Sequence, residues 1–311
     1  MPFKRSNVFE NQSPQALFVS HRVMQAILLA VLLAACSPVA QPTNPTETAP
    51  LPGPEQVTPS VSPPVGMVNG EPISSQSFTI HLSLYQTAQT ETGTLLASEN
   101  MQQLVLDDLV NRLLLAQGAR AQGFRLDEAT LDQRLAMVVG QTGDQAIFDA
   151  WLAEQGFTAE SFRQELAIEI EAGWMRTELS EAVPLNAEQM LARQILLTDR
   201  FQAERLLDQL ENNVPFQQVA MNNDAQGLGY LGWFPRGYLL QPAVEEAAFG
   251  LQAGETSGIV ETSLGFHLIE VLDWQADRPL TQQARLSLQM QALADWLEAQ
   301  RAQSTIENFL P

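Results

Sequence analysis

A proline-rich segment, residues 37–64, limits where this chain can fold. It holds nine prolines among Thr, Ser and Gln, and it has no apolar periodicity. Proline lacks the backbone N–H that helices and sheets use, and it favours extended polyproline II backbone. We therefore expect residues 36–64 to be a disordered, semi-extended tether, and we expect the globular part of the 311-residue chain to begin near residue 65.

The segment before the tether has the pattern of an export signal. Basic residues precede a thirteen-residue apolar run, residues 23–35, that contains one polar break. The run is shorter than the ~20 apolar residues that cross a bilayer, and it suits the core of a secretory signal. It ends in Leu-Ala-Ala before Cys36, which resembles the lipobox of bacterial lipoproteins. The resemblance implies a signal peptide over residues 1–35, lipidation of Cys36 and an extracytoplasmic protein anchored to a membrane. A free cysteine in an ordinary signal or signal anchor is the alternative.

Charge and composition exclude several classes of function. Asp and Glu total 36 against 16 Lys and Arg, a net charge of −20, which argues against binding to nucleic acid phosphates. Lys4 is the only lysine, so no P-loop or Schiff-base lysine is present beyond it. A catalytic zinc site usually needs two or three histidines with supporting carboxylates, and this chain has only His21, His81 and His267 to supply them, which does not favour a metal centre. We expect neither a metal nor a cofactor.

Residues 65–184 carry the periodicity of a helical domain. Residues 65–73 predict a short β-hairpin turning at Asn-Gly. Apolar residues then recur at spacings of three and four over residues 104–118, and again in stretches that begin near Leu131 and Phe148. Thr158 is placed as the N-cap of a last helix, which Pro184 ends. Taken alone, this pattern predicts a helical bundle that serves as a scaffold.

Three stretches of this domain give it a family resemblance. They are VNGEPIS, LDDLVNRLLLAQGARAQGF and GFTAESFRQELAIEIEAGWM. Together they resemble the N-terminal domain shared by exported folding chaperones of the trigger-factor, SurA and PrsA type. The resemblance implies a chaperone lobe over residues 65–184.

Residues 187–273 have a different pattern, which predicts a small α+β domain with an antiparallel sheet. The expected elements are a strand at 191–197, helices at 201–210 and from 214, a Gly-rich loop at 227–234, a short helix at 244–249, and strands at 257–261 and 266–272. The loop contains a G-x-G-x-x-G pattern. We reject a nucleotide-binding function for it because no strand precedes the loop and Pro235 soon follows.

The second half of this domain resembles a parvulin-type, PpiC-like prolyl isomerase. The matching motifs, in order, are Gly-Trp-Phe at 232–234, Glu-Ala-Ala-Phe at 246–249, Gly-Glu at 254–255 and Gly-Phe-His-Leu-Ile at 265–269. The resemblance implies the parvulin fold, a small antiparallel sheet with surrounding helices. It also implies peptidyl-prolyl cis-trans isomerisation of unfolded or newly exported polypeptides with X–Pro bonds, without a cofactor.

The same resemblance places a candidate site. His267 matches the central histidine of the family, Thr262 the hydroxyl near it, and Asp224 a position held by Cys or Asp. Gln194 departs from the family, which usually has a second histidine there. The apolar proline pocket corresponds to Leu231, Leu239 and Val244, with Phe249 beneath. The alternatives are a structural role for His267 in a sheet, a turn role for Asp224, and ordinary core packing for the pocket residues.

Residues 280–311 contain an amphipathic helix at 285–303 that is too short to be stable alone. The family resemblance suggests that it packs on the helical domain, and a dimer contact is the alternative.

Two other functions rival the isomerase. One is a holdase with a degenerate isomerase domain, favoured by Gln194 and by a short loop after Asp224. The other is a maturation factor for one exported partner. The sequence leaves clients and oligomeric state open.

Overall fold

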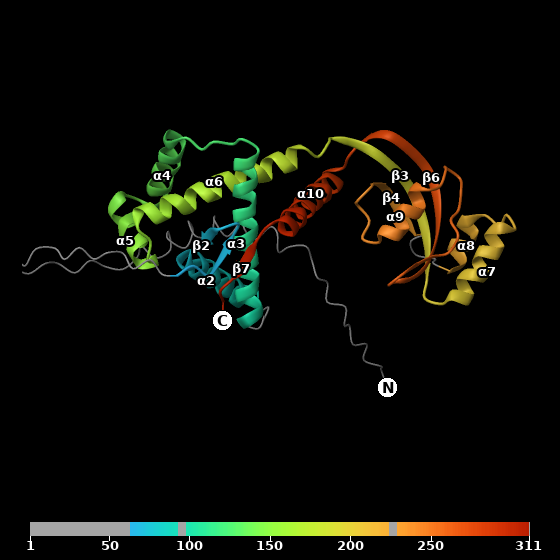
Figure 1. The fold of residues 1–311 in the computed structure, drawn as a ribbon. Helices are drawn as coiled ribbons and strands as arrows, with labels where there is room; N and C mark the ends of the chain where they lie inside the picture. The colour runs from blue at the N-terminus through green and yellow to red at the C-terminus, as the bar shows by residue number, and fades with distance from the viewer. Residues whose placement is uncertain (1–62, 93–97, 224–228, 311) are drawn as a thin grey trace, which may run out of the picture. The chain divides into compact units, whose positions relative to one another are not determined.

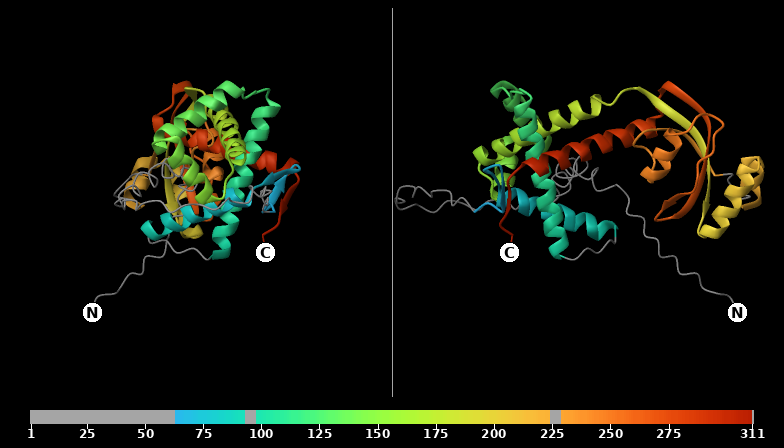
Figure 2. Two further views of the ribbon diagram at one scale, coloured as in Figure 1. Left: turned by 90° about the vertical axis from the view of Figure 1, so that its left-hand side faces the viewer. Right: turned by 45° about the vertical axis from the view of Figure 1, so that its right-hand side comes forward.

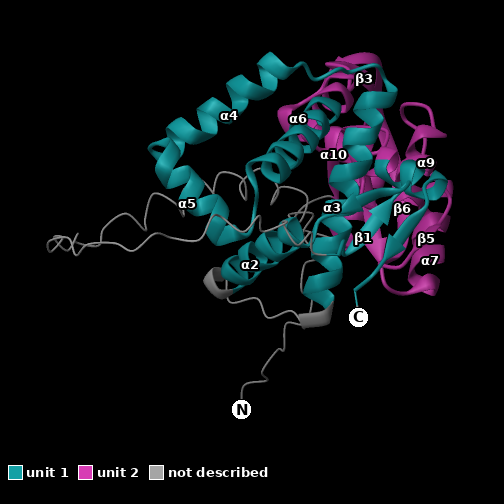
Figure 3. Cartoon of the chain, turned by 60° about the vertical axis from the view of Figure 1, so that its left-hand side comes forward, with its two compact units in different colours: residues 1–176, 297–311 teal, residues 177–296 magenta. Residues whose placement is uncertain are grey.

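The computed structural model describes residues 63–92, 98–223 and 229–310. The chain divides into two compact units, which Figure 3 shows in different colours. Unit 1 comprises residues 1–176 and 297–311, and unit 2 comprises residues 177–296. Unit 2 is therefore inserted between two segments of unit 1. The expected signal peptide, Cys36 and the tether up to residue 62 lie outside the described residues.

Unit 1 consists of helices and one small sheet (Figure 1). Its helices are α2 (Ser75–Thr92), α3 (Ser98–Ala121), α4 (Glu128–Thr142), α5 (Gln145–Gln155) and most of α6 (Ala159–Glu181), together with the end of α10 (Gln282–Gln303). Its sheet has the order β2-β1-β7, formed by β2 (Glu71–Ile73), β1 (Gly66–Val68) and β7 (Ile306–Asn308).

The predicted helical periodicity produces the core of unit 1. The apolar face of α3 is buried, with exposed fractions between 1% and 3% for Leu106, Leu109, Val110, Leu113 and Leu114. The expected N-cap is confirmed, because the Ser161 amide donates to the Thr158 hydroxyl at 3.0 Å. Helix α5 ends at Gly156, whose φ of 76° is the left-handed conformation that favours glycine.

The small sheet contains one strand that the sequence did not predict. The expected hairpin is confirmed, with Asn69 and Gly70 at φ 52° and 82° between β1 and β2. Strand β7 then pairs with β1 in antiparallel fashion, so that Val68 lies opposite Ile306. Asn69 fixes the approach of β7, because its amide donates to the Thr305 carbonyl at 2.8 Å. Two distant parts of the chain thus complete unit 1.

Unit 2 is built on a four-stranded antiparallel sheet of order β4-β3-β6-β5. The strands are β3 (Asn186–Leu197), β4 (Tyr230–Pro235), β5 (Val260–Thr262) and β6 (Gly265–Pro279). The helices are α7 (Arg200–Glu211), α8 (Phe216–Asn223) and α9 (Pro242–Phe249), with the first part of α10. The α+β class expected from the sequence is confirmed.

One expectation for unit 2 is wrong, because the Gly-rich run predicted as a loop is a strand from Tyr230 onward. The strand contains a bulge: Ala192 lies opposite Gly232 and Arg193 opposite Tyr230, which leaves Leu231 as the extra residue. Gly232 has a φ of 74° there. Glycine supplies the backbone freedom that the bulge needs, and the aromatic residues around it favour strand pairing.

Helices cover the two faces of this sheet separately. Helices α7 and α8 lie on one side and α9 on the other (Figures 1 and 2). On the first side, Ile195, Leu197 and Leu268 pack with residues of α7 and α8. On the second side, Met190, Ile269 and Val271 pack with Val244 and Ala248 of α9. We call this second side the α9 face.

Phe234 tests this arrangement because its ring is fully buried in the core of the α9 face. We expect Phe234→Ala to lower the free energy of unfolding of unit 2 by about 3–5 kcal/mol, the usual cost of removing a large core ring. Chemical denaturation followed by circular dichroism measures the change. Phe201→Ala is the control: that ring is 73% exposed, so we expect a change below about 0.5 kcal/mol. Equal losses in the two variants would contradict the packing described here.

Candidate functional site

Strand alternation brings two of the predicted site residues to the α9 face. Side chains two positions apart on a strand share a face. His267 precedes Ile269 by two positions on β6, and Gln194 follows Ala192 by two positions on β3. Both Ile269 and Ala192 belong to the core of the α9 face. His267 and Gln194 therefore lie on that face, on the two central strands of the sheet.

A series of hydrogen bonds connects these residues with a third. The Nδ1 atom of His267 lies 2.8 Å from Oε1 of Gln194, and its Nε2 lies 2.8 Å from Oγ1 of Thr262. The Leu264 amide donates to the same Thr262 oxygen at 3.1 Å. Thr262 comes from β5, so three strands contribute to the series. We call Gln194, His267 and Thr262 the polar triad.

The pattern of donors and acceptors identifies the state of the imidazole. With the amide of Leu264 already donating to Thr262, the Thr262 hydroxyl can donate its own hydrogen to Nε2 of His267. Nδ1 then carries the proton and donates it to the Gln194 oxygen. The His267 side chain is only 1% exposed, and this burial lowers its pKa below the usual range. The ring is thus neutral and held at both nitrogens.

A glycine allows Gln194 to occupy its position. The Gln194 amide donates to the carbonyl oxygen of Gly229 at 2.8 Å. Gly229 has a φ of 61°, and a Cβ atom built on it would lie 1.7 Å from the Gln194 carbonyl oxygen. Only glycine fits such an approach. The Gly-rich run therefore supports the polar triad from the backbone.

The four residues expected to form the proline pocket come together on the α9 face. Val244 is buried in its core, and Leu231, Leu239 and Phe249 pack against that core while remaining partly exposed. The rings of Phe249 and Phe234 meet edge to face, with centroids 5.9 Å apart. Partly exposed apolar side chains over a buried floor are what a pocket for a small ring requires.

Two predicted residues cannot be placed, and two contributors were missed. Asp224 and Cys36 lie outside the described residues. The missed residues are Arg236, whose guanidinium lies 4.0 Å from the centre of the Phe249 ring, and Glu245, whose carboxylate accepts from the amides of residues 237–239. Proline at the start of α9 marks a helix N-terminus, where a carboxylate is favoured, and this was the available signal for Glu245.

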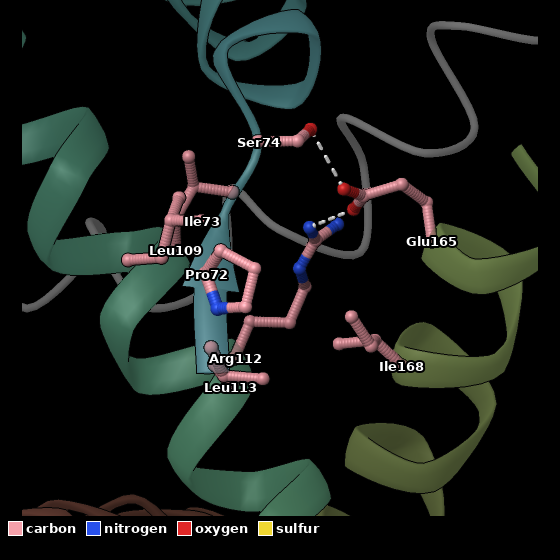
Figure 4. A pocket seen from close by; sticks show the side chains of 8 residues that line it. All are labelled: Pro72, Ile73, Ser74, Leu109, Arg112, Leu113, Glu165 and Ile168. Carbon is pink, nitrogen blue, oxygen red and sulfur yellow. Dashed lines mark hydrogen bonds and ion pairs between the residues drawn. The ribbon is translucent and has the colours of Figure 1, made fainter. Parts of the chain in front are cut away.

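Unit 1 has a small hollow between β2, α3 and α6 (Figure 4). Its polar side is an ion pair between Arg112 and Glu165, and Ser74 donates to Glu165 at 2.9 Å. Apolar residues such as Ile73 and Leu109 form the rest of its wall.

Among the described residues, no group of three or more His, Cys, Asp or Glu is arranged to hold a metal ion. Within the same residues, no helix is long and apolar enough to cross a membrane.

Comparison with known families agrees with the division into two parts. Residues 22–175 match the family described as the SurA-like N-terminal domain. Residues 198–273 match the family described as the PPIC-type PPIASE domain. The second match includes Thr262 and His267 of the polar triad, whereas Gln194 lies just before it.

Curated relatives match over part of their length. Foldase protein PrsA of Geobacillus sp. (strain WCH70) is 26% identical over 179 residues, which cover 56% of this chain and 62% of that protein. Chaperone SurA of Alkalilimnicola ehrlichii is 28% identical over 207 residues, covering 55% of this chain and 47% of that protein. The chain thus spans about half to three-fifths of these relatives. A solved structure of the peptidylprolyl isomerase PrsA from Bacillus cereus is 18% identical, with a TM-score of 0.41, and covers 75% of this chain and 83% of that chain.

The imidazole of His267 is buried and hydrogen-bonded at both nitrogens, which predicts its tautomer and the direction of its pKa shift. We expect ¹⁵N spectra of the full chain to show His267 protonated at Nδ1 and unprotonated at Nε2, with a pKa below the ordinary value of about 6.5. A lowered pKa means that the unfolded state binds the proton first. Unit 2 should therefore lose stability as the pH falls below about 6.5 and should not lose it above.

The control is the Thr262→Val variant, which keeps the shape of the side chain and removes the donor to Nε2. We expect the Nε2 resonance to shift in this variant while unit 2 remains folded. A charged ring at pH 6.5, or a proton on Nε2 in the parent protein, would contradict the arrangement.

Proposed function

We propose that this chain, which joins a SurA-like N-terminal domain to a PPIC-type rotamase domain, is a peptidyl-prolyl cis-trans isomerase and folding chaperone. The observation that carries the proposal is the position of the polar triad beside a partly exposed apolar cluster on the same sheet face. An isomerase of X–Pro bonds needs a dry surface for the proline ring and polar groups next to it. The α9 face has both.

Isomerisation of an X–Pro bond requires no reactive side chain. Rotation about an X–Pro bond disrupts amide resonance, with an uncatalysed barrier of about 18–20 kcal/mol, and no bond is made or broken. The twisted amide has less charge separation than the planar one, so an apolar pocket favours it. Each ~1.4 kcal/mol gained only in the twisted state gives about tenfold in rate. Neither a nucleophile nor a cofactor is needed.

Within this mechanism the polar triad has two roles. Gln194 is partly exposed and its side-chain NH2 group remains available, so it can donate to the substrate carbonyl or prolyl nitrogen, whereas Thr262 gives its only hydroxyl hydrogen to His267. His267 is buried, so it acts as a positioning residue that orients the other two. We assign the proline ring to the surface formed by Leu231, Leu239, Val244 and Phe249. Asp224, which the family resemblance also places at the site, completes this assignment.

We extend the proposal to location and clients. The relatives are foldases and chaperones named PrsA and SurA, which supports unfolded polypeptides as the client class. The apolar run followed by Cys36 supports export and attachment through a lipid. The substrates would then be newly exported chains with X–Pro bonds, met outside the cytoplasm near a membrane.

A holdase without isomerase activity is the second candidate, and unit 1 supplies the observation that favours it. Four aromatic rings, those of Phe148, Trp151, Phe157 and Phe162, meet where α5 joins α6. Trp151 and Phe157 are partly exposed, and Ile147 nearby is 49% exposed. Exposed apolar groups of this kind can bind unfolded segments whether or not unit 2 is active.

The isomerase is tested with a protease-coupled assay on a proline-containing tetrapeptide. We expect the parent protein to accelerate isomerisation and His267→Ala to lower kcat/KM by about 30-fold. The reason is the loss of two hydrogen bonds worth about 1 kcal/mol each. His81→Ala removes a histidine from the other unit and should leave the rate unchanged.

The same proteins are then compared in an aggregation assay with a denatured client. A parent rate equal to that of His267→Ala and of buffer would eliminate the isomerase. If the parent protein shows no isomerase activity but still suppresses aggregation, and Trp151→Ala weakens this suppression, the protein is a holdase.

Attachment to a membrane is tested separately by replacing Cys36. We expect the full chain, produced in a bacterium, to incorporate labelled fatty acid and to partition into the detergent phase. Cys36→Ser should lose both properties because serine cannot form the thioether. Labelling that persists in the Ser variant would refute lipidation at this position.

A further inference from the structure

The loop between β4 and α9 is tied to the helix that follows it by one carboxylate. Three consecutive backbone amides donate to Glu245: Gly237 to Oε1 at 2.6 Å, and Tyr238 and Leu239 to Oε2 at 3.0 Å each. Both carboxylate oxygens are thereby used. Gly237 has a φ of 79°, a conformation that favours glycine, and its amide donates to the same carboxylate as the next two amides.

This arrangement replaces the usual cap of α9. The N-cap residue, Gln241, makes no side-chain hydrogen bond to the helix. Glu245 lies in the first turn, where a negative charge is favourable, and it binds the loop instead of the helix amides. Hydrogen bonds to an ionised acceptor are about twice as strong as neutral ones. This one carboxylate therefore connects three consecutive loop amides to α9.

The loop in turn places a wall of the candidate proline pocket. Tyr238 and Leu239 are partly buried against the core of the α9 face, whereas the next residue, Leu240, is 95% exposed. Glu245 follows Val244, which is the buried floor of the same cluster. One carboxylate thus connects the wall and the floor, although it lies outside the polar triad.

We propose that Glu245 is a positioning residue that holds Leu239 against the apolar cluster containing Val244 and so shapes the surface for the proline ring. The proposal rests on the function proposed above. This wall would contact the pyrrolidine ring and not the rotating amide, so its contact is the same in the cis, trans and twisted states and contributes uniform binding. Its loss should therefore raise KM and leave kcat nearly unchanged, unlike the loss of the polar triad.

The experiment compares Glu245→Ala with Glu246→Ala in the full chain. Glu246 is the exposed neighbour on the same helix, so its replacement removes the same charge. We expect Glu245→Ala to raise KM on the order of tenfold, because three charge-assisted hydrogen bonds are lost, and Glu246→Ala to leave it unchanged. Glu245→Gln keeps one acceptor oxygen and should give an intermediate KM.

Hydrogen–deuterium exchange of the peptide segment 236–241 is the second measurement. Exchange should accelerate in Glu245→Ala, less in Glu245→Gln and not at all in Glu246→Ala. Equal KM and exchange in the two alanine variants would overturn the proposal, as would a fall in kcat alone. A lower thermal midpoint with unchanged KM would also overturn it, because the role would then be purely structural.

Failure of the proposed function gives a different result. If the parent protein does not isomerise the peptide, the dissociation constant of the proline peptide, measured by calorimetry, takes the place of KM. Weaker binding by Glu245→Ala than by Glu246→Ala then supports the positioning role in a binding site. Equal binding by both variants refutes it.

Discussion

The pairing of β3 with β6 is the interaction on which unit 2 depends. These two strands form the centre of the sheet, from Asn186 opposite Pro279 to Leu197 opposite Phe266. Because side chains alternate along each strand, the register decides at once which residues form the two cores and which polar groups meet. A shift of one position would send Gln194 and His267 to opposite faces and break the hydrogen bond between them. Burial of the apolar side chains fixes the β3–β6 register, and the same register places Gln194 and His267 on one face.

In the polar triad, glutamine stands at the position where the family resemblance would place a second histidine. Glutamine at position 194 offers an oxygen at the distance that a hydrogen bond to the imidazole requires. It differs from histidine in that it cannot titrate. Burial lowers the pKa of His267, so its imidazole stays neutral at a lower pH than an exposed histidine would. The isomerisation proposed above transfers no proton, so it would not require a titrating group at position 194.

Much of this could be predicted from the sequence, and the failures have a common cause. The helices of unit 1 follow from local periodicity, and the Gly-Phe-His motif with Thr262 indicated the site. Strand β4 was missed because its glycines suggest a loop, although the bulge uses one of them to direct Leu231 to the α9 face. Strand β7 has three residues and is defined by a partner more than 230 positions away. Glu245 was missed because its role is set by loop amides. In each case the partner lies outside the two-, three- and four-residue spacings of a single strand or helix, so it leaves no local periodicity.

The antiparallel contact of β1 with β7 has a consequence for the order in which the chain is built. Residues 306–308 are synthesised after the whole of unit 2. Until then, the edge of β1 that pairs with β7 has no partner strand. Unit 2 is contiguous and can close its sheet during that interval. During passage of the chain from its N-terminus, the small sheet of unit 1 is therefore finished last. Synthesis from the N-terminus thus leaves the small sheet of unit 1 incomplete until every residue of the inserted unit has been made.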